Sequence, residues 1–438
     1  MQKLSGWIVL SCLVLLGACS SASSCGYGRI CARPILSSPM PPDTPLQRNA
    51  PPAVIPAAPS ASAPVTTDAQ VRTFAVPAGG SAAIVPASTQ QETPPAPIRM
   101  ALLLPLRSEN LGTAAASVRA GFMAAFEREP GTVQITVFDT TDAPAQIVDM
   151  YQQAQQDNDV VIGPLLRQAV SAIAQSGQVG KPTIALNQPE GLPNGDPADL
   201  KLPPKLLLMG LSVEDEARQV ARWAQAEHGE APAYAVYGHS PWQKRAARAF
   251  AAQRLSQGLP TKMVQVAAQA GEVRSGDVLA LNTRLQADTG SLVFIALDAD
   301  AARELRKAVG AELPVYGTSQ LNPNVLAVSS EPAQELNGVR LLDVPWQLVP
   351  EHTVAMQYPR QVTPADQKPN PDMARLYALG IDAYRVAREI AVAKRTEFEL
   401  DGVTGKLHVQ LSADGARMER TAQPAVYRDG LVTPWPAR

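Results

Sequence analysis

Residues that could carry nucleophilic chemistry do not cluster along this 438-residue chain. The nearest approach to a nucleophile elbow is Gly238-His239-Ser240-Pro241-Trp242, which follows a strand-like run and precedes a helical pattern. An elbow needs a small residue two places after its serine, so that strand and helix can pack closely, and Trp242 occupies that place. A serine directly before a proline is instead typical of a helix N-cap. The sequence therefore predicts that Ser240 starts a helix, and it offers no catalytic residue.

Metal and phosphate sites are equally poorly supported. The four histidines, His228, His239, His352 and His408, form no i, i+4 pair on a predicted helix and have no cysteine partner. Neither GxxxxGK[ST] nor a GxGxxG after a predicted strand occurs, so a phosphate-binding loop is not expected. We predict neither a metal nor a cofactor. The formal net charge of −2 and the isoelectric point near 6.2 give no basic field for nucleic acid.

Seven polar residues lie on loops after predicted strands and are candidates for lining a ligand crevice. Parallel sheets bind ligands beyond the carboxyl ends of their strands. For each residue the alternative is loop polarity without a ligand, and for Asp139 it is the capping of a turn by its carboxylate. The candidates are Arg107, Ser108, Asp139, Asn187, Gln188, Ser319 and Gln320.

The elements that must position these residues begin with an alternation of strands and helices. Residues 98–104 form an apolar run of strand length that ends at Pro105, which cannot donate to a ladder. Such alternation favours a parallel sheet with helices on its faces. The strands expected in this first series are 98–104, 133–138, 159–162, 182–186 and 205–209, and the helices are 113–129, 144–156 and 165–176.

A second series starts near Leu211, where Ser212-Val213-Glu214-Asp215 has the signature of a capped helix start. Its expected helices are 212–228, 241–257, 277–286 and 299–309, and its strands are 234–237, 262–267, 292–296, 314–316 and 337–342. Beyond these we expect a turn at 345–346, an amphipathic helix at 373–393, an antiparallel strand at 402–411 and a last edge strand at 424–427.

Together the two series predict an α/β fold of two lobes, each a mainly parallel sheet flanked by helices. Roughly 340 residues remain from Ile98 onward, which suits two lobes better than one small core. We predict a first lobe at 98–211, rejoined by about 345–395, and a second lobe at 212–344, completed by about 396–438.

The amino terminus has the pattern of an export signal. Lys3 gives it a positive start, and an apolar run follows at 7–16. Its end, Leu16-Gly17-Ala18-Cys19, resembles the lipobox of bacterial lipoproteins, in which the signal is removed before the cysteine and the cysteine is acylated. That resemblance implies a signal peptide at 1–18 and lipid on Cys19, and Ser20 resembles the outer-membrane pattern. The alternative is an ordinary cleaved signal with an incidental cysteine.

Residues 19–97 are rich in alanine, proline, serine and threonine, and we expect a disordered linker because they cannot bury enough apolar surface to fold. Cys25 and Cys31 lie in this stretch and are candidates for a small disulfide in an oxidising compartment. No cysteine follows them, so the predicted fold contains neither a disulfide nor a thiol nucleophile.

From Ile98 to the end, the chain resembles the type I periplasmic binding-protein fold, and more closely the LppC or LpoA family of lipoprotein activators of penicillin-binding proteins. The most specific matching segments are Asp343-Val344-Pro345-Trp346 and the run from Arg375 to Tyr384. Further matches are 103–106, 119–122 with Ala125, 137–140, 161–165, Pro182 with 185–187, 211–217, 248–250, 313–319, 336–339 and 402–405.

The resemblance implies an outer-membrane lipoprotein that faces the periplasm, contacts a class A penicillin-binding protein and stimulates peptidoglycan synthesis without catalysis. It also implies that the helix at 373–393 rejoins the first lobe while the closing strands return to the second. One departure is that the best-known members carry a helical-repeat domain where this chain has only a linker. The alternative function is a receptor for a small molecule such as an amino acid, although the loops at 107–110 and 165–167 match an amino-acid clamp poorly.

Overall fold

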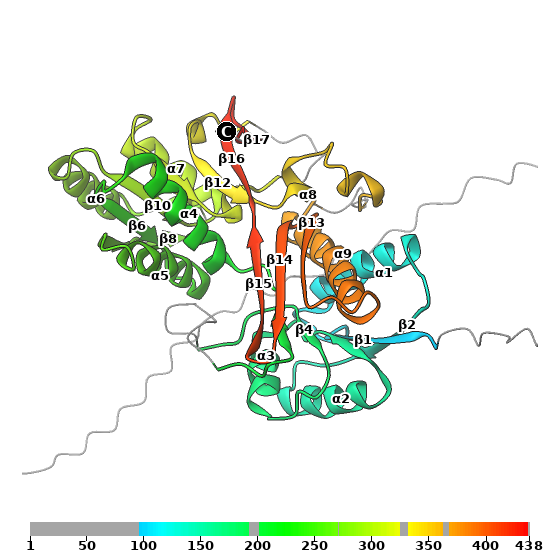
Figure 1. Ribbon diagram of the computed structural model, residues 1–438. Helices are drawn as coiled ribbons and strands as arrows, with labels where there is room; N and C mark the ends of the chain where they lie inside the picture. Colours follow the sequence, from blue (N-terminus) through cyan, green and yellow to red (C-terminus); the bar gives the residue numbers. More distant parts are fainter. Residues whose placement is uncertain (1–95, 192–200, 270, 325–331, 362–367, 437–438) are drawn as a thin grey trace, which may run out of the picture. The chain divides into compact units, whose positions relative to one another are not determined.

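The computed structural model describes residues 96–191, 201–269, 271–324, 332–361 and 368–436 (Figure 1). The expected signal peptide and nearly all of the expected linker lie outside these residues. The lipidation of Cys19 and the pairing of Cys25 with Cys31 therefore stay predictions. All described residues fall within one compact unit, Thr89–Arg438.

The first sheet is entirely parallel, as the alternation of elements predicted. Its strand order is β2-β1-β3-β4-β5, and β1 pairs Leu102 with Val137 of β2 on one side and with Ile162 of β3 on the other. The strands are β1 (Ile98–Leu104), β2 (Val133–Asp139), β3 (Val160–Ile162), β4 (Thr183–Ala185) and β5 (Leu206–Leu208). The connecting helices are α1 (Gly112–Arg128), α2 (Pro144–Asp157) and α3 (Arg167–Gln175).

The second sheet has five parallel strands extended by two antiparallel ones, in the order β17-β16-β12-β11-β10-β6-β7. Its strands are β6 (Ala233–Tyr237), β7 (Thr261–Gln265), β10 (Leu292–Ala296), β11 (Val315–Gly317), β12 (Arg340–Asp343), β16 (Gln423–Arg428) and β17 (Leu431–Pro434). Its helices are α4 (Val213–His228), α5 (Pro241–Leu255), α6 (Ser275–Ala287) and α7 (Ala299–Val309). The predicted α/β class, with parallel sheets flanked by helices, is confirmed.

The remaining elements connect or extend these sheets. A three-stranded antiparallel sheet consists of β13 (Glu397–Gly402), β14 (Gly405–Ser412) and β15 (Gly415–Thr421), and a small hairpin consists of β8 (Ala268–Gln269) and β9 (Glu272–Val273). The other helical segments are η2 (Ser319–Leu321), η3 (Gln334–Leu336), α8 (Pro345–Leu348), η4 (Ala355–Gln357) and α9 (Pro371–Ala391). None of the described helices combines the length and apolarity needed to cross a membrane.

Helix α9 lies directly against α1 in the core of the first sheet (Figure 1). Two glycines allow this close approach. A Cβ atom at Gly121 would lie 1.8 Å from the carbonyl oxygen of Tyr377, and one at Gly380 would lie 2.0 Å from that of Val118. Because a larger side chain at either glycine would force the helices apart, Gly121 and Gly380 fix α9 on the first sheet.

Strands β13 to β15 share the core of the first sheet. Phe398, Leu407 and Val409 belong to the same buried cluster as α1 and α9. The Asp382 carboxylate on α9 accepts hydrogen bonds from Val403 N at 3.1 Å and from Thr404 N at 2.8 Å, so the β13–β14 turn is tied to that helix. Within residues 396–438, strands β16 and β17 join the second sheet. The lobe boundaries stay predictions.

Candidate functional site

Three of the seven predicted cleft residues lie together at the ends of β1 and β2, where their side chains contact neighbouring groups of the protein. Arg107 donates from Nη2 to the Asp139 carbonyl oxygen at 2.7 Å, and its Nε lies 3.5 Å from Asp139 Oδ2. Ser108 Oγ accepts from Leu111 N at 2.8 Å, which closes the turn before α1. These groups support the loop that leaves β1.

Asn187 and Gln188 lie at the end of β4, apart from that first group. Asn187 Nδ2 donates to the Leu165 carbonyl oxygen at 2.9 Å. Gln188 Nε2 reaches across to helix α4 and donates to Asp215 Oδ2 at 2.8 Å. This contact joins a loop of the first sheet to a helix of the second.

Ser319 and Gln320 form a third location, at the end of β11. Glu216 on α4 accepts from Ser319 N at 2.8 Å and from Ser319 Oγ at 3.1 Å. Gln320 Nε2 lies 3.5 Å from Asp372 Oδ1 at the start of α9. The structure thus distributes the seven candidates over three places.

Sequence reasoning did not select the charged centre of the third location, which is Arg375 on α9. Its guanidinium binds the Asp343 carboxylate at the end of β12 with two hydrogen bonds, of 2.9 Å from Nε and 2.7 Å from Nη2. Nη2 also donates to the carbonyl oxygens of Ser319 and Asn322, each at 2.9 Å. Nη1 donates to Asp372 Oδ1 at 2.8 Å. The pair therefore fastens α9, which packs on the first sheet, to the second sheet.

The electrostatics of this junction follow from its burial. Burial would lower the pKa of Arg375, but the charge of Asp343 and the hydrogen bonds to it outweigh burial and raise that pKa. Burial raises the pKa of the neighbouring Glu216 to about 7; the hydrogen bonds from Ser319 and the charge of Arg375 oppose the shift, and the charge of Asp343 adds to it. Glu216 is thus the junction group that titrates near neutrality.

A second arginine, Arg420 on β15, ties the three-stranded sheet to the segment that follows β5. Its Nη1 donates to the Gly210 carbonyl oxygen at 2.7 Å, its Nη2 to that of Met209 at 2.8 Å, and its Nε to Thr404 Oγ1 at 3.2 Å. None of these three partners carries a charge. Burial therefore lowers the pKa of Arg420, although more distant carboxylates, Asp382 foremost, oppose the shift.

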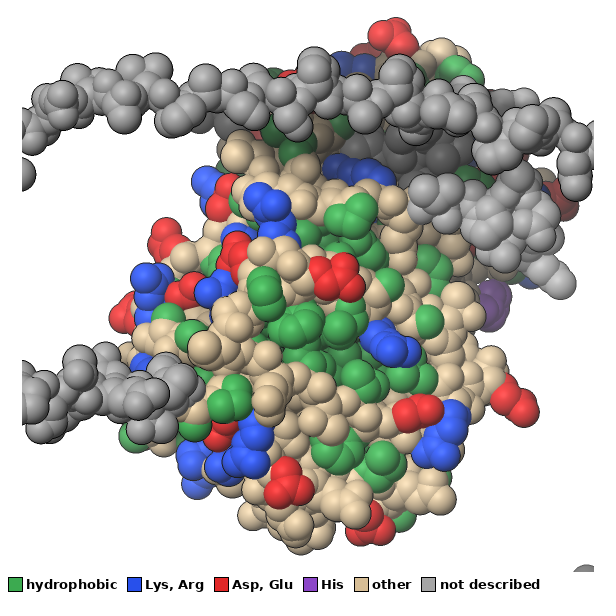
Figure 2. All heavy atoms as spheres, turned by 90° about the vertical axis from the view of Figure 1, so that its right-hand side faces the viewer, with side chains coloured by type: hydrophobic (Ala, Val, Ile, Leu, Met, Phe, Trp, Pro, Cys, Tyr) green, Lys and Arg blue, Asp and Glu red, His purple; other side chains and the backbone are tan. Residues whose placement is uncertain are grey.

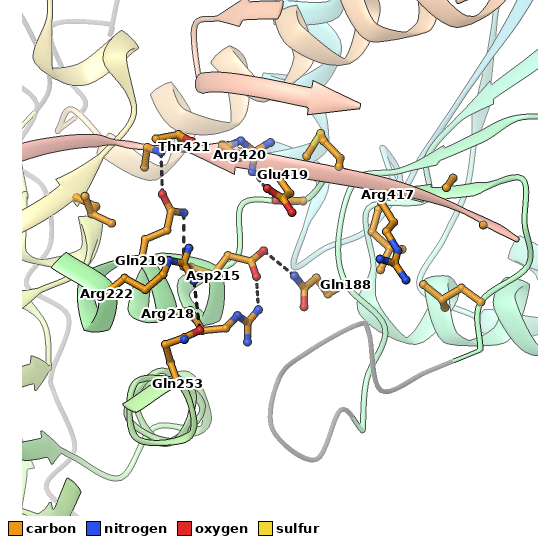
Figure 3. A pocket seen from close by; sticks show the side chains of 18 of the residues that line it. Gln188, Asp215, Arg218, Gln219, Arg222, Gln253, Arg417, Glu419, Arg420 and Thr421 are labelled. Carbon is orange, nitrogen blue, oxygen red and sulfur yellow. Dashed lines mark hydrogen bonds and ion pairs between the residues drawn. The ribbon is translucent and has the colours of Figure 1, made fainter. Parts of the chain in front are cut away.

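A cavity of about 840 Å³ opens beside β15 (Figure 3). Helix α4 contributes Asp215, Arg218 and Arg222 to its wall, and Gln188 enters from the end of β4. Strand β15 contributes Arg417, Glu419 and Arg420. Of the seven candidates predicted from the sequence, only Gln188 lines this cavity. In the part of the chain that the structure describes, no three histidine, cysteine or acidic side chains come together as metal ligands.

The two helix starts predicted from the sequence are confirmed, and both helices contribute residues to the wall of the cavity. Ser212 Oγ accepts from Asp215 N at 3.1 Å at the N-cap of α4, the helix that carries Glu216 and lines the cavity. Ser240 is the N-cap of α5, where its backbone N–H donates to Gln243 Oε1 at 3.1 Å. Ser240 therefore caps a helix, as the sequence predicted.

Comparison with known proteins identifies a family whose model matches most of the chain. The family model described as "LppC putative lipoprotein" matches residues 82–430, which is more than half of the chain. A curated relative, the penicillin-binding protein activator LpoA of Edwardsiella ictaluri, is 29% identical over 420 residues, covering 85% of this chain and 57% of the relative. LpoA of Photobacterium profundum is 26% identical, covering 76% of this chain and 56% of the relative. The chain thus spans about half the length of these curated relatives.

Solved structures show the same fold. The C-domain of LpoA from Haemophilus influenzae, described as a regulator of PBP1A, is 21% identical with a TM-score of 0.57, covering 77% of this chain and all of that domain. A protein from Chromobacterium violaceum, described as a "putative branched-chain amino acid ABC transporter", is 35% identical with a TM-score of 0.58, covering 75% of this chain and 99% of that one. With the family model matched along most of its length, the chain belongs to the LppC lipoprotein family.

Proposed function

We propose that this protein is an outer-membrane lipoprotein that binds a class A penicillin-binding protein and activates it, without catalysing a reaction itself. The observation that carries the proposal is membership of the LppC family together with curated relatives that are named penicillin-binding protein activators. The sequence Leu16-Gly17-Ala18-Cys19 supports a lipid anchor on Cys19, and Ser20 supports the outer membrane as its location.

The geometry at the strand ends favours recognition of a macromolecule over capture of a small solute in the predicted crevice. Arg107 is engaged by Asp139, Asn187 by a backbone carbonyl oxygen, and Ser319 by Glu216. A solute clamp at these positions would first have to break those contacts. One face of the protein, on the side where α1 and β2 lie, shows apolar side chains surrounded by charged ones (Figure 2). Apolar areas with a polar rim are typical of protein interaction surfaces.

The decisive experiment combines the purified full chain with a purified class A penicillin-binding protein. We expect the two proteins to co-purify and the cross-linking rate of the enzyme to rise when the chain is added. The variant C19A should still activate in solution, because the anchor serves localisation and not the contact. If the purified proteins neither associate nor change the cross-linking rate, the proposed function is wrong.

The anchor has a separate test in cells. Labelled palmitate should be incorporated into the wild-type chain and into the control variant C25A, and not into C19A. The wild-type chain should fractionate with outer membranes, whereas C19A should not. Labelling of C19A at the wild-type level would exclude Cys19 as the lipid site.

A second candidate function is a receptor for an amino acid, and one observation favours it. The structural relative with 35% identity is described as a branched-chain amino acid ABC transporter. A thermal-shift screen against amino acids distinguishes the two functions, because a ligand at a hundred times its dissociation constant stabilises a protein by about 2.7 kcal/mol. Stabilisation of this size by one amino acid, without an effect on the penicillin-binding protein, would favour the receptor.

A further inference from the structure

The cavity beside β15 lies apart from the loop that leaves β1 and from the Arg375 junction. Neither Arg107, Asp139, Ser319 nor Arg375 lines it. Its volume of about 840 Å³ is within the range of roughly 300–1,000 Å³ that is usual for small-molecule sites. It therefore has the space for a ligand of its own.

Gln188 supplies an unused hydrogen-bond acceptor to this cavity. The residue is only 3% exposed, and its Oε1 atom has no hydrogen-bond partner among the described residues. Its Nε2 donates to Asp215 Oδ2, so the amide oxygen points away from that contact (Figure 3). A buried amide oxygen without a donor is energetically unfavourable, and most such atoms in proteins are satisfied by a protein group, water or ligand. A ligand that donates an N–H or O–H to Gln188 Oε1 would therefore be stabilised there.

Strand β15 supplies an unused cation on the same cavity. Ala416 and Met418 turn toward the core of the first sheet, so the alternation of a strand places Arg417 and Glu419 on the opposite, exposed face. Both line the cavity. Within the described part of the chain, the guanidinium of Arg417 makes no hydrogen bond or ion pair. A free guanidinium suits a carboxylate, and the Glu419 carboxylate suits a further N–H group.

We propose that this cavity binds a short peptide with a free carboxyl terminus. The peptide carboxylate lies against Arg417, and a peptide N–H donates to Gln188 Oε1. Glu419 accepts from the ammonium group or another amide of the ligand. A short peptide is a simple chemical class that carries a carboxylate, an ammonium group and several N–H donors. The inference stands on the cavity alone and does not rest on the proposed activation of a penicillin-binding protein.

Calorimetric titration of the full chain with trialanine tests the proposal. We expect saturable binding at one site, and binding at least tenfold weaker for trialanine amide, which lacks the carboxylate. The variant R417Q should weaken trialanine binding at least tenfold, because it removes a charge-assisted hydrogen bond. It should leave binding of trialanine amide unchanged, so the two changes are not additive. The variant Q188M should weaken both peptides to a similar extent, because both carry the N–H group.

Two controls keep the test specific. R119Q changes an exposed arginine on α1 that does not line the cavity, and it should leave trialanine binding unchanged. Thermal unfolding of R417Q should match that of the wild-type chain, because the Arg417 side chain makes no polar contact with the residues that the structure describes. The proposal is overturned if trialanine binds no more tightly than about 1 mM. It is also overturned if R417Q binds trialanine as well as the wild-type chain does, or if acetate competes as strongly as trialanine.

Discussion

Two arginines each tie separate elements of the fold together, and their hydrogen-bond partners differ in charge. Arg375 binds Asp343 with two hydrogen bonds and also reaches Asp372, so its charge is matched by carboxylates. Arg420 binds the backbone carbonyl oxygens of Met209 and Gly210 and the hydroxyl of Thr404. Accordingly, the pKa is raised at Arg375 and lowered at Arg420.

This contrast between charged and neutral partners indicates which of the two arginines is needed to balance a buried charge. Removing Arg375 would strand Asp343, whose side chain is 0% exposed, as an unpaired buried anion. Removing Arg420 would leave only neutral acceptors without donors. The two arginines are therefore expected to differ in how much each stabilises the protein, and the following variants measure that difference.

The largest effect is expected for R375M. Methionine keeps much of the apolar bulk but leaves Asp343 without its cation, so the free energy of unfolding should fall by about 3–5 kcal/mol. Urea denaturation of the full chain measures this change. The double variant R375M/D343L should lose less than R375M alone, because the stranded anion is then gone. A loss at R375M below about 1 kcal/mol would show that the pair is not coupled to folding.

The next effect concerns pH and the Glu216 carboxyl beside Arg375. Its folded-state pKa of about 7 is above its ordinary value of 4.5, so between these values the folded state binds more protons than the unfolded state. Stability from this group therefore decreases as the pH rises from 4.5 to about 7. At 1.36 kcal/mol per pKa unit the total change is about 3 kcal/mol. Urea midpoints across this pH range should show the slope in the wild-type chain and a flatter profile in E216Q.

A smaller effect is expected for R420M. The variant loses hydrogen bonds to two carbonyl oxygens and one hydroxyl but leaves no charge unpaired, so the free energy of unfolding should fall by about 1–3 kcal/mol. The same urea titration measures it beside R375M. If R420M proves as destabilising as R375M, matched carboxylates are not what distinguishes the two junctions.

Much of the fold could be predicted because its strands and helices carry local patterns. The apolar runs at 98–104 and 292–296 and the helix at 299–309 were predicted with the bounds that the structure shows. Parallel-sheet strands are buried on both faces and read as continuous apolar runs. Their alternation with helices of crossover length then predicted the parallel sheets.

The closing strands were predicted less well. The sequence predicted one strand at 402–411, whereas the structure has a hairpin that turns between Gly402 and Gly405. That turn is held by Asp382, a residue of α9, so its position depends on a tertiary contact. The strand at 424–427 was expected to be the edge, but β17 pairs beyond it. The expected turn at 345–346 is the start of α8.

The charged junction was missed although its segments were recognised. Both Asp343 and Arg375 lie in motifs that carried the family resemblance, and each is a charge beside apolar residues, as in Leu341-Leu342-Asp343. That signal could have identified them as a buried pair, since charges rarely enter a core unpaired. Loop residues such as Gln320 were chosen by position after a strand, which does not reveal the partner that a loop meets in the fold.

The smallest effect is expected at Arg107, which the sequence did single out. Its ion pair with Asp139 has side chains 58% and 41% exposed, so solvent screens the attraction that burial strengthens at Arg375. R107A should therefore change the free energy of unfolding by less than about 1 kcal/mol, and added salt should reduce the change further. A loss approaching that of R375M would mean that the exposed pair stabilises the protein as much as the buried pair, so burial would not be what distinguishes them. Because Arg107 and Arg375 both pair with an aspartate at the end of a strand, the contrast isolates burial as the variable.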